Sequence, residues 1–204
     1  SEQEATQLMD APSVLKHRTL HPATISCLVG LLYCCGLRIG EALRLDLADF
    51  DRAAGTLLVR HGKFGKQRRI PLHPSARQAL LDYLAQRKIH SRIDPHTPLF
   101  ASTEGKPLIY SSVHRLFGRL LQITGIAQRR GPVRPHDLRH SFASTVLRRA
   151  AKDHADLYAI LPKLATVMGH VSFSSTQIYL HADPVLLARA GNAFRQSFFD
   201  TVNR

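Results

Sequence analysis

A central, buried helix is predicted by the stretch from residue 22 to residue 35. The stretch is almost wholly apolar, contains no charged residue and includes Ile25, Leu28, Leu31 and Cys35. A helix with so little polar surface has to be covered by other elements. Its most apolar run, Ile25 to Cys35, is well short of the roughly 18 residues that a membrane span needs. The chain is therefore expected to be a soluble domain built around this helix.

Gly36 ends this helix and places Arg38 at a junction. Glycine is favoured directly after a helix because it adopts the left-handed conformation without a steric penalty. Leu37 and Arg38 then lead into a second helix that contains Ile39 and Leu43. Arg38 is thus expected between two buried helices, where a charge is costly unless it meets a counter-charge.

The rest of the chain is predicted to form further helices around one small sheet. Apolar alternation predicts a β-hairpin with strands at 56–60 and 67–72, and at most one short strand is expected at 99–101. Residues 128–135 are expected to form a basic loop. Periodicity and capping residues predict helices that begin at Ser75, at Ser111 or Ser112, near His136, at residues 157 and 174, and after Asp183-Pro184. The predicted fold class is mainly α (α+β), a helical domain with a small antiparallel sheet.

The charge balance indicates a polyanionic partner. The 204 residues include 28 Lys and Arg against 15 Asp and Glu, which gives a net charge of +13, and 44% of the residues are hydrophobic. This apolar content excludes a disordered basic tail. The pI of 10.4 exceeds the value of about 9 that flags nucleic-acid binding. Charge alone does not separate a nucleic-acid-binding domain from a ribosome-like protein, a membrane-surface protein or a domain that is merely basic.

Six residues along the chain carry chemistry that a neutral core would not need. They are cations, imidazoles and one phenol, in the order Arg38, Lys63, His136, Arg139, His170 and Tyr179. The arginine fork matches the oxygens of a phosphate, and a tyrosine hydroxyl can be a covalent nucleophile when cations stabilise the attacked group. Each residue by itself is more often structural, and Glu41 is a ready ion-pair partner for Arg38. The functional interpretation rests on their joint occurrence.

These residues resemble the tyrosine recombinase (phage integrase) family over about residues 22–190. The family's motifs appear here as CGLRIGEAL with Arg38, GKFGKQRRIPL with Lys63, HDLRHSFAS with His136 and Arg139, and MGH with His170, followed by Tyr179. The segment between Arg139 and His170 is longer than the family's usual spacing, which suggests a transposon-type subgroup.

The resemblance implies a covalent mechanism on DNA. Tyr179 would attack a scissile phosphodiester, form a 3′-phosphotyrosyl link and release a 5′ hydroxyl. Arg38 and Arg139 would hold the non-bridging oxygens, and the loss of either would cost about 3 kcal/mol in the barrier, or roughly a hundredfold in rate. The bond energy is conserved in the phosphotyrosyl link, so no ATP is required.

The same resemblance assigns the remaining chemistry and the DNA contacts. Lys63 would be the general acid for the leaving 5′ oxygen, His136 the base toward the tyrosine, and His170 a donor to the phosphate. No metal or other cofactor is expected. The predicted backbone contacts to double-stranded DNA are the further cations Lys66, Arg68, Arg69, Arg129, Arg130 and Arg134.

The resemblance also predicts domains and partners. Residues 1–21 would be a linker or first helix from a missing N-terminal core-binding domain, and residues 22–204 the catalytic domain. A homotetramer on DNA is expected through the C-terminal helix, whose apolar face is Leu187, Ala190, Phe194 and Phe198. The expected location is the bacterial cytoplasm, in association with the nucleoid and without a membrane partner.

Three alternative functions remain open from the sequence. A type IB topoisomerase-like enzyme shares the tyrosine and the arginine clamp but relaxes DNA instead of exchanging strands. A zinc hydrolase would use His136 and His140, which are four residues apart, but Asp137 stands where the zincin motif has Glu. A DNA-binding module without catalysis would lack turnover altogether.

Overall fold

The computed structural model of the chain describes residues 1–14, 22–60, 65, 67–87, 94, 96–130, 132–153, 155–170, 176, 178 and 179. It divides into two compact units, Ser1–Arg139 and His140–Arg204, which are called unit 1 and unit 2 below. The boundary falls inside helix α7 (Pro135–Lys152), whose first turn belongs to unit 1.

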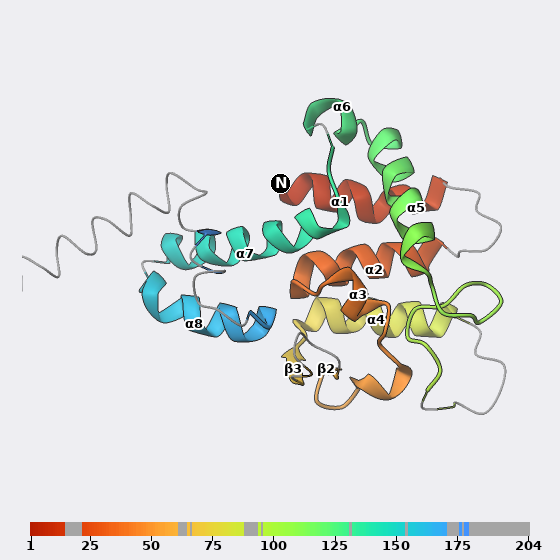
Figure 1. Ribbon diagram of the computed structural model, residues 1–204, viewed down its shortest axis with the longest axis horizontal. Helices are drawn as coiled ribbons and strands as arrows, with labels where there is room; N and C mark the ends of the chain where they lie inside the picture. The colour runs from red at the N-terminus through yellow and green to blue at the C-terminus, as the bar shows by residue number, and fades with distance from the viewer. Residues whose placement is uncertain are drawn as a thin grey trace, which may run out of the picture. The chain divides into compact units, whose positions relative to one another are not determined.

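Helix α2 (Pro22–Cys35) is the central helix of unit 1, as the sequence predicts. It packs against both α1 (Glu2–Asp10) and α4 (Pro74–Gln86), and Figure 1 shows it running between them. Its buried residues include Ile25, Leu28 and Leu32. The short helix η1 (Ala11–Val14) lies against the same helix. Burial against several neighbours explains why nearly every position of α2 is apolar.

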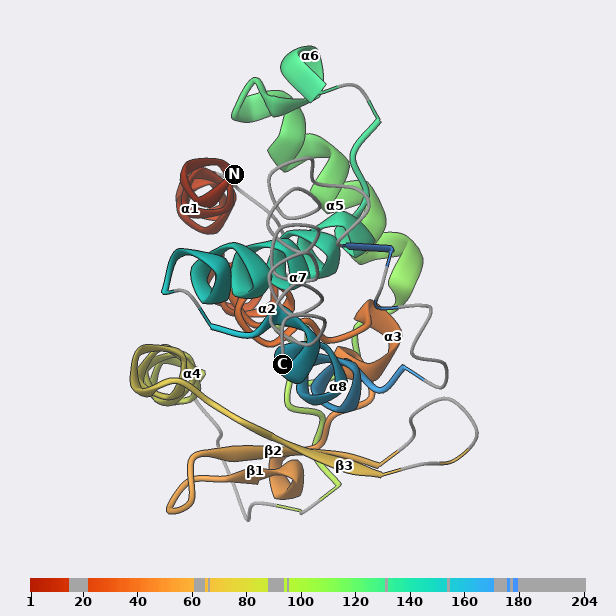
Figure 2. The same cartoon turned by 90° about the vertical axis from the view of Figure 1, so that its left-hand side faces the viewer.

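The predicted second helix and hairpin are both present in unit 1. The helix after Gly36 is a single turn, α3 (Ile39–Ala42), and η2 (Leu47–Asp49) follows it. The sheet has antiparallel strands in the order β1 (Phe50–Asp51), β2 (Thr56–Val59) and β3 (Arg68–Pro71), visible side by side in Figure 2. The strand β1 adds to the predicted hairpin. The short strand predicted at 99–101 is reduced to isolated bridges, Asp46 with Pro98 and Ala101 with Pro107.

The later helices of unit 1 differ in part from the prediction. Helix α5 (Tyr110–Ile123) has Ile109 as its N-cap and not Ser111 or Ser112, so it begins two or three residues earlier than predicted, because the carbonyl of Ile109 already accepts from the N–H groups of Ser112 and Val113. The expectation of an uninterrupted loop at 128–135 was wrong. A short helix α6 (Ile126–Arg130) occupies its start, since Gly125 at φ 68° redirects the chain and Ile126 is buried.

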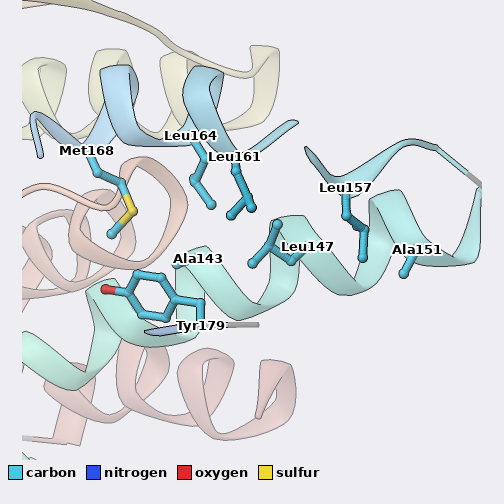
Figure 3. Packing of buried hydrophobic residues seen from close by; sticks show 8 residues of the cluster. All are labelled: Ala143, Leu147, Ala151, Leu157, Leu161, Leu164, Met168 and Tyr179. Atoms are coloured by element: carbon cyan, nitrogen blue, oxygen red, sulfur yellow. The ribbon is translucent and has the colours of Figure 1, made fainter. Parts of the chain in front are cut away.

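Unit 2 is built on the remainder of α7 and on α8 (Leu157–Met168), the helix predicted at residue 157. Side chains of α8 and α7 interlock in one apolar cluster that also holds Tyr179 (Figure 3). Its buried members are Ala143, Leu147, Ala151, Leu157, Leu161, Leu164, Met168 and Tyr179. Of the helix predicted at residue 174, residues 176, 178 and 179 are described, and all three are helical. The predicted final helix lies outside the described residues.

Candidate functional site

Arg38 is held by Glu41, as the sequence suggests. The backbone N–H of Arg38 donates to Glu41 Oε2 at 3.0 Å, and Arg38 Nη1 donates to Glu41 Oε1 at 2.9 Å. The Glu41 side chain is 2% exposed and that of Arg38 is 29% exposed. The same carboxylate therefore starts helix α3 and fixes the arginine that precedes it.

A second arginine binds the same carboxylate. Arg68 donates from Nη1 to Glu41 Oε1 at 3.0 Å and from Nη2 to Glu41 Oε2 at 2.8 Å, which is the bidentate fork geometry. Burial raises the pKa of Glu41, but the hydrogen bonds from Arg68 and Arg38 outweigh it and lower the pKa to about 2. Glu41 is thus a fixed anion between two cations.

Arg139 is the largest fully buried side chain of unit 1, with 1% exposure. Its Nη1 donates to the backbone carbonyl of Gly36, which ends α2 at φ 61°. Arg139 therefore bonds to the chain two residues before Arg38. His136, three residues earlier on α7, is exposed, and Asp137 accepts from the backbone N–H of Arg134 at 2.7 Å, which stabilises the start of this helix. We call Arg38, Glu41, Arg68 and Arg139 the arginine cluster.

In unit 2, Tyr179 lies between two imidazoles. Its ring is stacked on that of His170, with centroids 6.3 Å apart and planes at 10°, and it is tilted against the ring of His140 at 5.4 Å. Tyr179 is 5% exposed. His170 follows α8 directly, because Gly169 at φ 65° ends that helix and the N–H of His170 donates to Ala165.

Thr176 fixes the orientation of His170. Thr176 Oγ1 and His170 Nδ1 form a hydrogen bond of 2.7 Å, and Thr176 is fully buried. When the threonine hydroxyl donates, the ring proton is carried by Nε2, which can then donate to an anion. We call His140, His170, Thr176 and Tyr179 the tyrosine cluster.

The predicted DNA contacts fall into three groups. Lys63 and Lys66 lie outside the described residues. Four of the predicted arginines lie on the surface of unit 1, namely Arg69, Arg129, Arg130 and Arg134. Two of these have partners on α1, because Arg130 pairs with Glu4 at 3.0 Å and Arg129 donates to Gln7 at 3.3 Å. Arg68 differs from both groups, since its side chain is only 10% exposed.

Sequence reasoning did not single out the inward position of Arg68 or the role of Thr176. The signal for Arg68 was present: residues two apart on a strand share one face, and Ile70 is buried. Thr176 sits in a run of serines and threonines and had no comparable signal.

The described part of the chain has neither a metal-binding cluster nor a membrane-spanning helix. Within it, no group of three or more His, Cys, Asp or Glu side chains is placed to hold a metal ion. Among the helices described, none is long and apolar enough to cross a bilayer.

Comparison with known proteins assigns the family. The sequence matches the Phage integrase family over residues 1–185. The chain belongs to this family. The match includes residues 1–21 along with the motifs that carry Arg38, His136, Arg139, His170 and Tyr179.

The relatives are bacterial recombinases and integrases. The y4rB protein of Sinorhizobium fredii is 42% identical over 175 residues, which are 84% of this chain and 55% of the relative. The tyrosine recombinase XerC of Thermodesulfovibrio yellowstonii is 36% identical over 185 residues, 88% of this chain and 56% of the relative. The chain therefore spans little more than half the length of these relatives.

Solved structures share the architecture. The XerA recombinase superposes with a TM-score of 0.72 and 29% identity, over 96% of this chain and 64% of that one. The XerH site-specific recombinase, in a post-cleavage complex with palindromic difH substrate, gives 0.70 and 25%, over 96% of this chain and 52% of its own. The predicted fold class, a mainly helical catalytic domain with a small antiparallel sheet, is confirmed.

Proposed function

We propose that the chain breaks and rejoins DNA strands as the catalytic part of a site-specific tyrosine recombinase. The observation that carries the proposal is the buried guanidinium of Arg139, bonded to the carbonyl of Gly36 two residues before Arg38. Both guanidinium groups are held in place, since Arg139 bonds to Gly36 and Arg38 bonds to Glu41, and donors fixed in advance stabilise a developing negative charge without reorganisation. Two arginines that are fixed to the same short segment can both donate to one tetrahedral anion such as a phosphate, and Tyr179 supplies a nucleophile.

The reaction exchanges one ester bond to phosphorus for another and needs no added energy source. The Tyr179 oxygen forms a bond to phosphorus at the 3′ side while the bond from phosphorus to the 5′ oxygen breaks. His136 takes the phenolic proton, and Lys63 delivers a proton to the leaving oxygen. Arg38 and Arg139 stabilise the negative charge of the transition state, with His170 as an additional donor. Rejoining is the same sequence in reverse, with a 5′ hydroxyl of the partner strand as nucleophile.

Association with DNA is expected to rest on the surface arginines. Arg69, Arg129, Arg130 and Arg134 are exposed, and Lys66 belongs to the same predicted surface. Because phosphate contacts release counterions, the binding constant falls steeply as salt rises. A binding constant that does not change between 50 and 200 mM salt would contradict this surface.

Assembly through the C-terminal segment is the finer part of the proposal. Unit 1 contains an open cavity of about 610 Å³ whose lining combines apolar residues such as Met9, Leu31 and Tyr83 with polar ones such as Asp10 and Asp82. The apolar residues after Asp183-Pro184 in a neighbouring copy match the apolar part of this lining, which supports docking between copies in the proposed homotetramer on DNA. Phe194→Asp is expected to prevent strand exchange while single-site cleavage persists. The bacterial relatives support a cytoplasmic, nucleoid-associated location.

A covalent trap tests the chemistry. The DNA substrate carries a nick close to the scissile phosphate, so that the short strand released on cleavage diffuses away and the phosphotyrosyl link accumulates. The wild-type protein is expected to form an adduct that survives denaturing electrophoresis and persists in chelator. Tyr179→Phe is expected to form none while it binds the same DNA. Equal behaviour of the two proteins would refute the mechanism, and a strand-exchange assay between two sites separates a recombinase from a relaxing enzyme.

A further inference from the structure

Glu41 is the meeting point of two arginines with different surroundings. Its Oε1 accepts from Arg38 Nη1 and Arg68 Nη1, and its Oε2 accepts from the Arg38 backbone and Arg68 Nη2, all between 2.8 and 3.0 Å. Four donors occupy the usual acceptor capacity of a carboxylate. Glu41 is therefore fully engaged by these two residues.

The two arginines contact Glu41 in different ways. Arg68 is 10% exposed and turns its whole fork to Glu41, whereas Arg38 is 29% exposed and gives Glu41 one side-chain nitrogen in this contact. One carboxylate cannot neutralise two guanidinium groups, so the trio keeps one net positive charge. With Arg68 absent, the negative charge of Glu41 would be cancelled by Arg38 alone.

We propose that Arg68 is a positioning residue which, by occupying Glu41 with its fork, keeps the charge and the orientation of Arg38 available to the scissile phosphate. This inference rests on the proposed function. It gives Arg68 a different role from the DNA backbone contact expected from the sequence: Arg68 acts on the phosphate through Glu41 and Arg38, while the exposed neighbour Arg69 stays with the backbone surface.

The register of β3 supports this role. Arg68 pairs with Val59 at the end of β3, and it shares the inner face of the strand with Ile70, which is buried. The guanidinium therefore leaves a strand held by the sheet and reaches a helix start held by Glu41. A bidentate bond between two such elements restricts both the position and the rotation of the carboxylate.

The test measures cleavage and binding separately. Two quantities are measured for each protein: the rate of single-turnover adduct formation at saturating DNA, and the dissociation constant for DNA with its salt dependence. The proteins are the wild type, Arg68→Met, Arg68→Lys and the matched exposed variant Arg77→Met. Arg68→Met is expected to slow cleavage roughly 10- to 100-fold, because misplacing a group that binds the reacting phosphate has effects of this size. Its affinity for DNA and its salt slope are expected to change by no more than about twofold. Arg68→Lys should fall between the wild type and Arg68→Met, since it keeps the charge and loses the fork.

Two further readouts distinguish positioning from simple loss of structure. The double variant Arg68→Met with Glu41→Gln lacks the carboxylate that neutralises Arg38 but keeps an amide oxygen that accepts a hydrogen bond from Arg38. Its cleavage is therefore expected to be severalfold faster than that of Arg68→Met. On a substrate whose scissile phosphate is a methylphosphonate, in which a methyl group replaces one charged oxygen, the Arg68→Met defect is expected to shrink to a few-fold. A variant that merely folds poorly would show neither effect.

Each outcome decides between distinct conclusions. An Arg68→Met protein that cleaves like the wild type at saturating DNA, but binds more weakly with a shallower salt slope, would show that Arg68 is a backbone contact and overturn the inference alone. Failure of Glu41→Gln to restore any cleavage, together with an undiminished defect on the methylphosphonate, would also overturn it. A wild-type protein that forms no adduct would overturn the proposed function and this inference with it.

Discussion

The arginine cluster and the tyrosine cluster hold their functional groups by different forces. In unit 1, Arg38 and Arg139 are fixed by directed polar bonds to Glu41 and to the Gly36 carbonyl. In unit 2, Tyr179 is fixed by apolar packing against the side chains of α7 and α8 and by stacking on His170 (Figure 3). A buried guanidinium needs its donors satisfied, whereas a phenol gains free energy from burial of its ring.

This difference suits the proposed chemistry. Cations that must stabilise a short-lived charge work best when they are held rigidly beforehand, because they then need no reorganisation during the reaction. A nucleophile that alternates between a free and a covalently linked state has to move out of its contacts. Non-directional apolar packing opposes this movement less than a salt bridge in which all hydrogen bonds are formed. The two clusters should therefore respond differently to the same kind of substitution.

The largest effect is expected for Arg139→Met. Removal of the guanidinium takes away the proposed phosphate ligand and leaves the Gly36 carbonyl without this buried donor. Single-turnover cleavage should fall at least about a hundredfold, and the free energy of unfolding should fall by about 1–3 kcal/mol. Adduct formation and urea unfolding measure the two quantities. Arg148→Met, an exposed arginine on the same helix, is the control, and equal effects at both positions would contradict the special role of Arg139.

In the tyrosine cluster, Leu161→Ala is expected to act on stability first. Leu161 is fully buried among α7 and α8, so the cavity left behind should cost about 2–5 kcal/mol in the free energy of unfolding. Ile178→Ala, at an exposed residue of the same unit, should change it by no more than about 0.5 kcal/mol. At temperatures where the variant stays folded, cleavage should drop far less than in Arg139→Met. A cleavage defect as large as that of Arg139→Met would mean that packing, too, sets the reaction rate.

Acid should weaken the arginine cluster, because this cluster depends on the charge of Glu41. Arg68 and Arg38 lower the pKa of Glu41 to about 2, against an ordinary value of 4.5. A carboxyl whose pKa is lowered by folding contributes its full stabilisation at pH values above its ordinary pKa. This stabilisation is lost as the pH falls from the ordinary pKa toward the lowered pKa. Between pH 5 and pH 3 this group should account for roughly 2 kcal/mol of stability. Glu41→Gln should remove this part of the pH dependence in thermal unfolding, and an unchanged pH profile would rule it out.

The smallest effect is expected for Thr176→Val, which removes one hydroxyl with little change of shape. Loss of the hydrogen bond to His170 Nδ1 should cost about 1 kcal/mol in stability and tenfold or less in cleavage. Thr166→Val, at an exposed position on α8, is the matched control and should leave cleavage unchanged. A shift in the pH profile of cleavage with Thr176→Val alone would show that the threonine sets the protonation of His170.

Much of the fold follows from local sequence signals. The uncharged stretch at 22–35 predicts a central helix because only burial satisfies it, and glycines at 36 and 169 mark helix ends because their backbone is left-handed there. Helix α6 was missed because a basic composition was interpreted as a loop, although Ile126 needed burial. The start of helix α5 was predicted two or three residues late because a serine was expected as the N-cap, whereas Ile109, whose side chain forms no capping bond, holds that position.

The sequence by itself determined which residues are predicted to carry the chemistry, since arginine, histidine and tyrosine in this order indicate phosphate binding and a nucleophile. It also determined the partner of Arg38, because Glu41 follows three residues later and the reach is local. The tertiary structure decided that Arg68 shares Glu41 across 27 positions and that Arg139 bonds to Gly36 across 103. Contacts between residues so far apart in the chain depend on how helices and strands pack, and no local pattern encodes them.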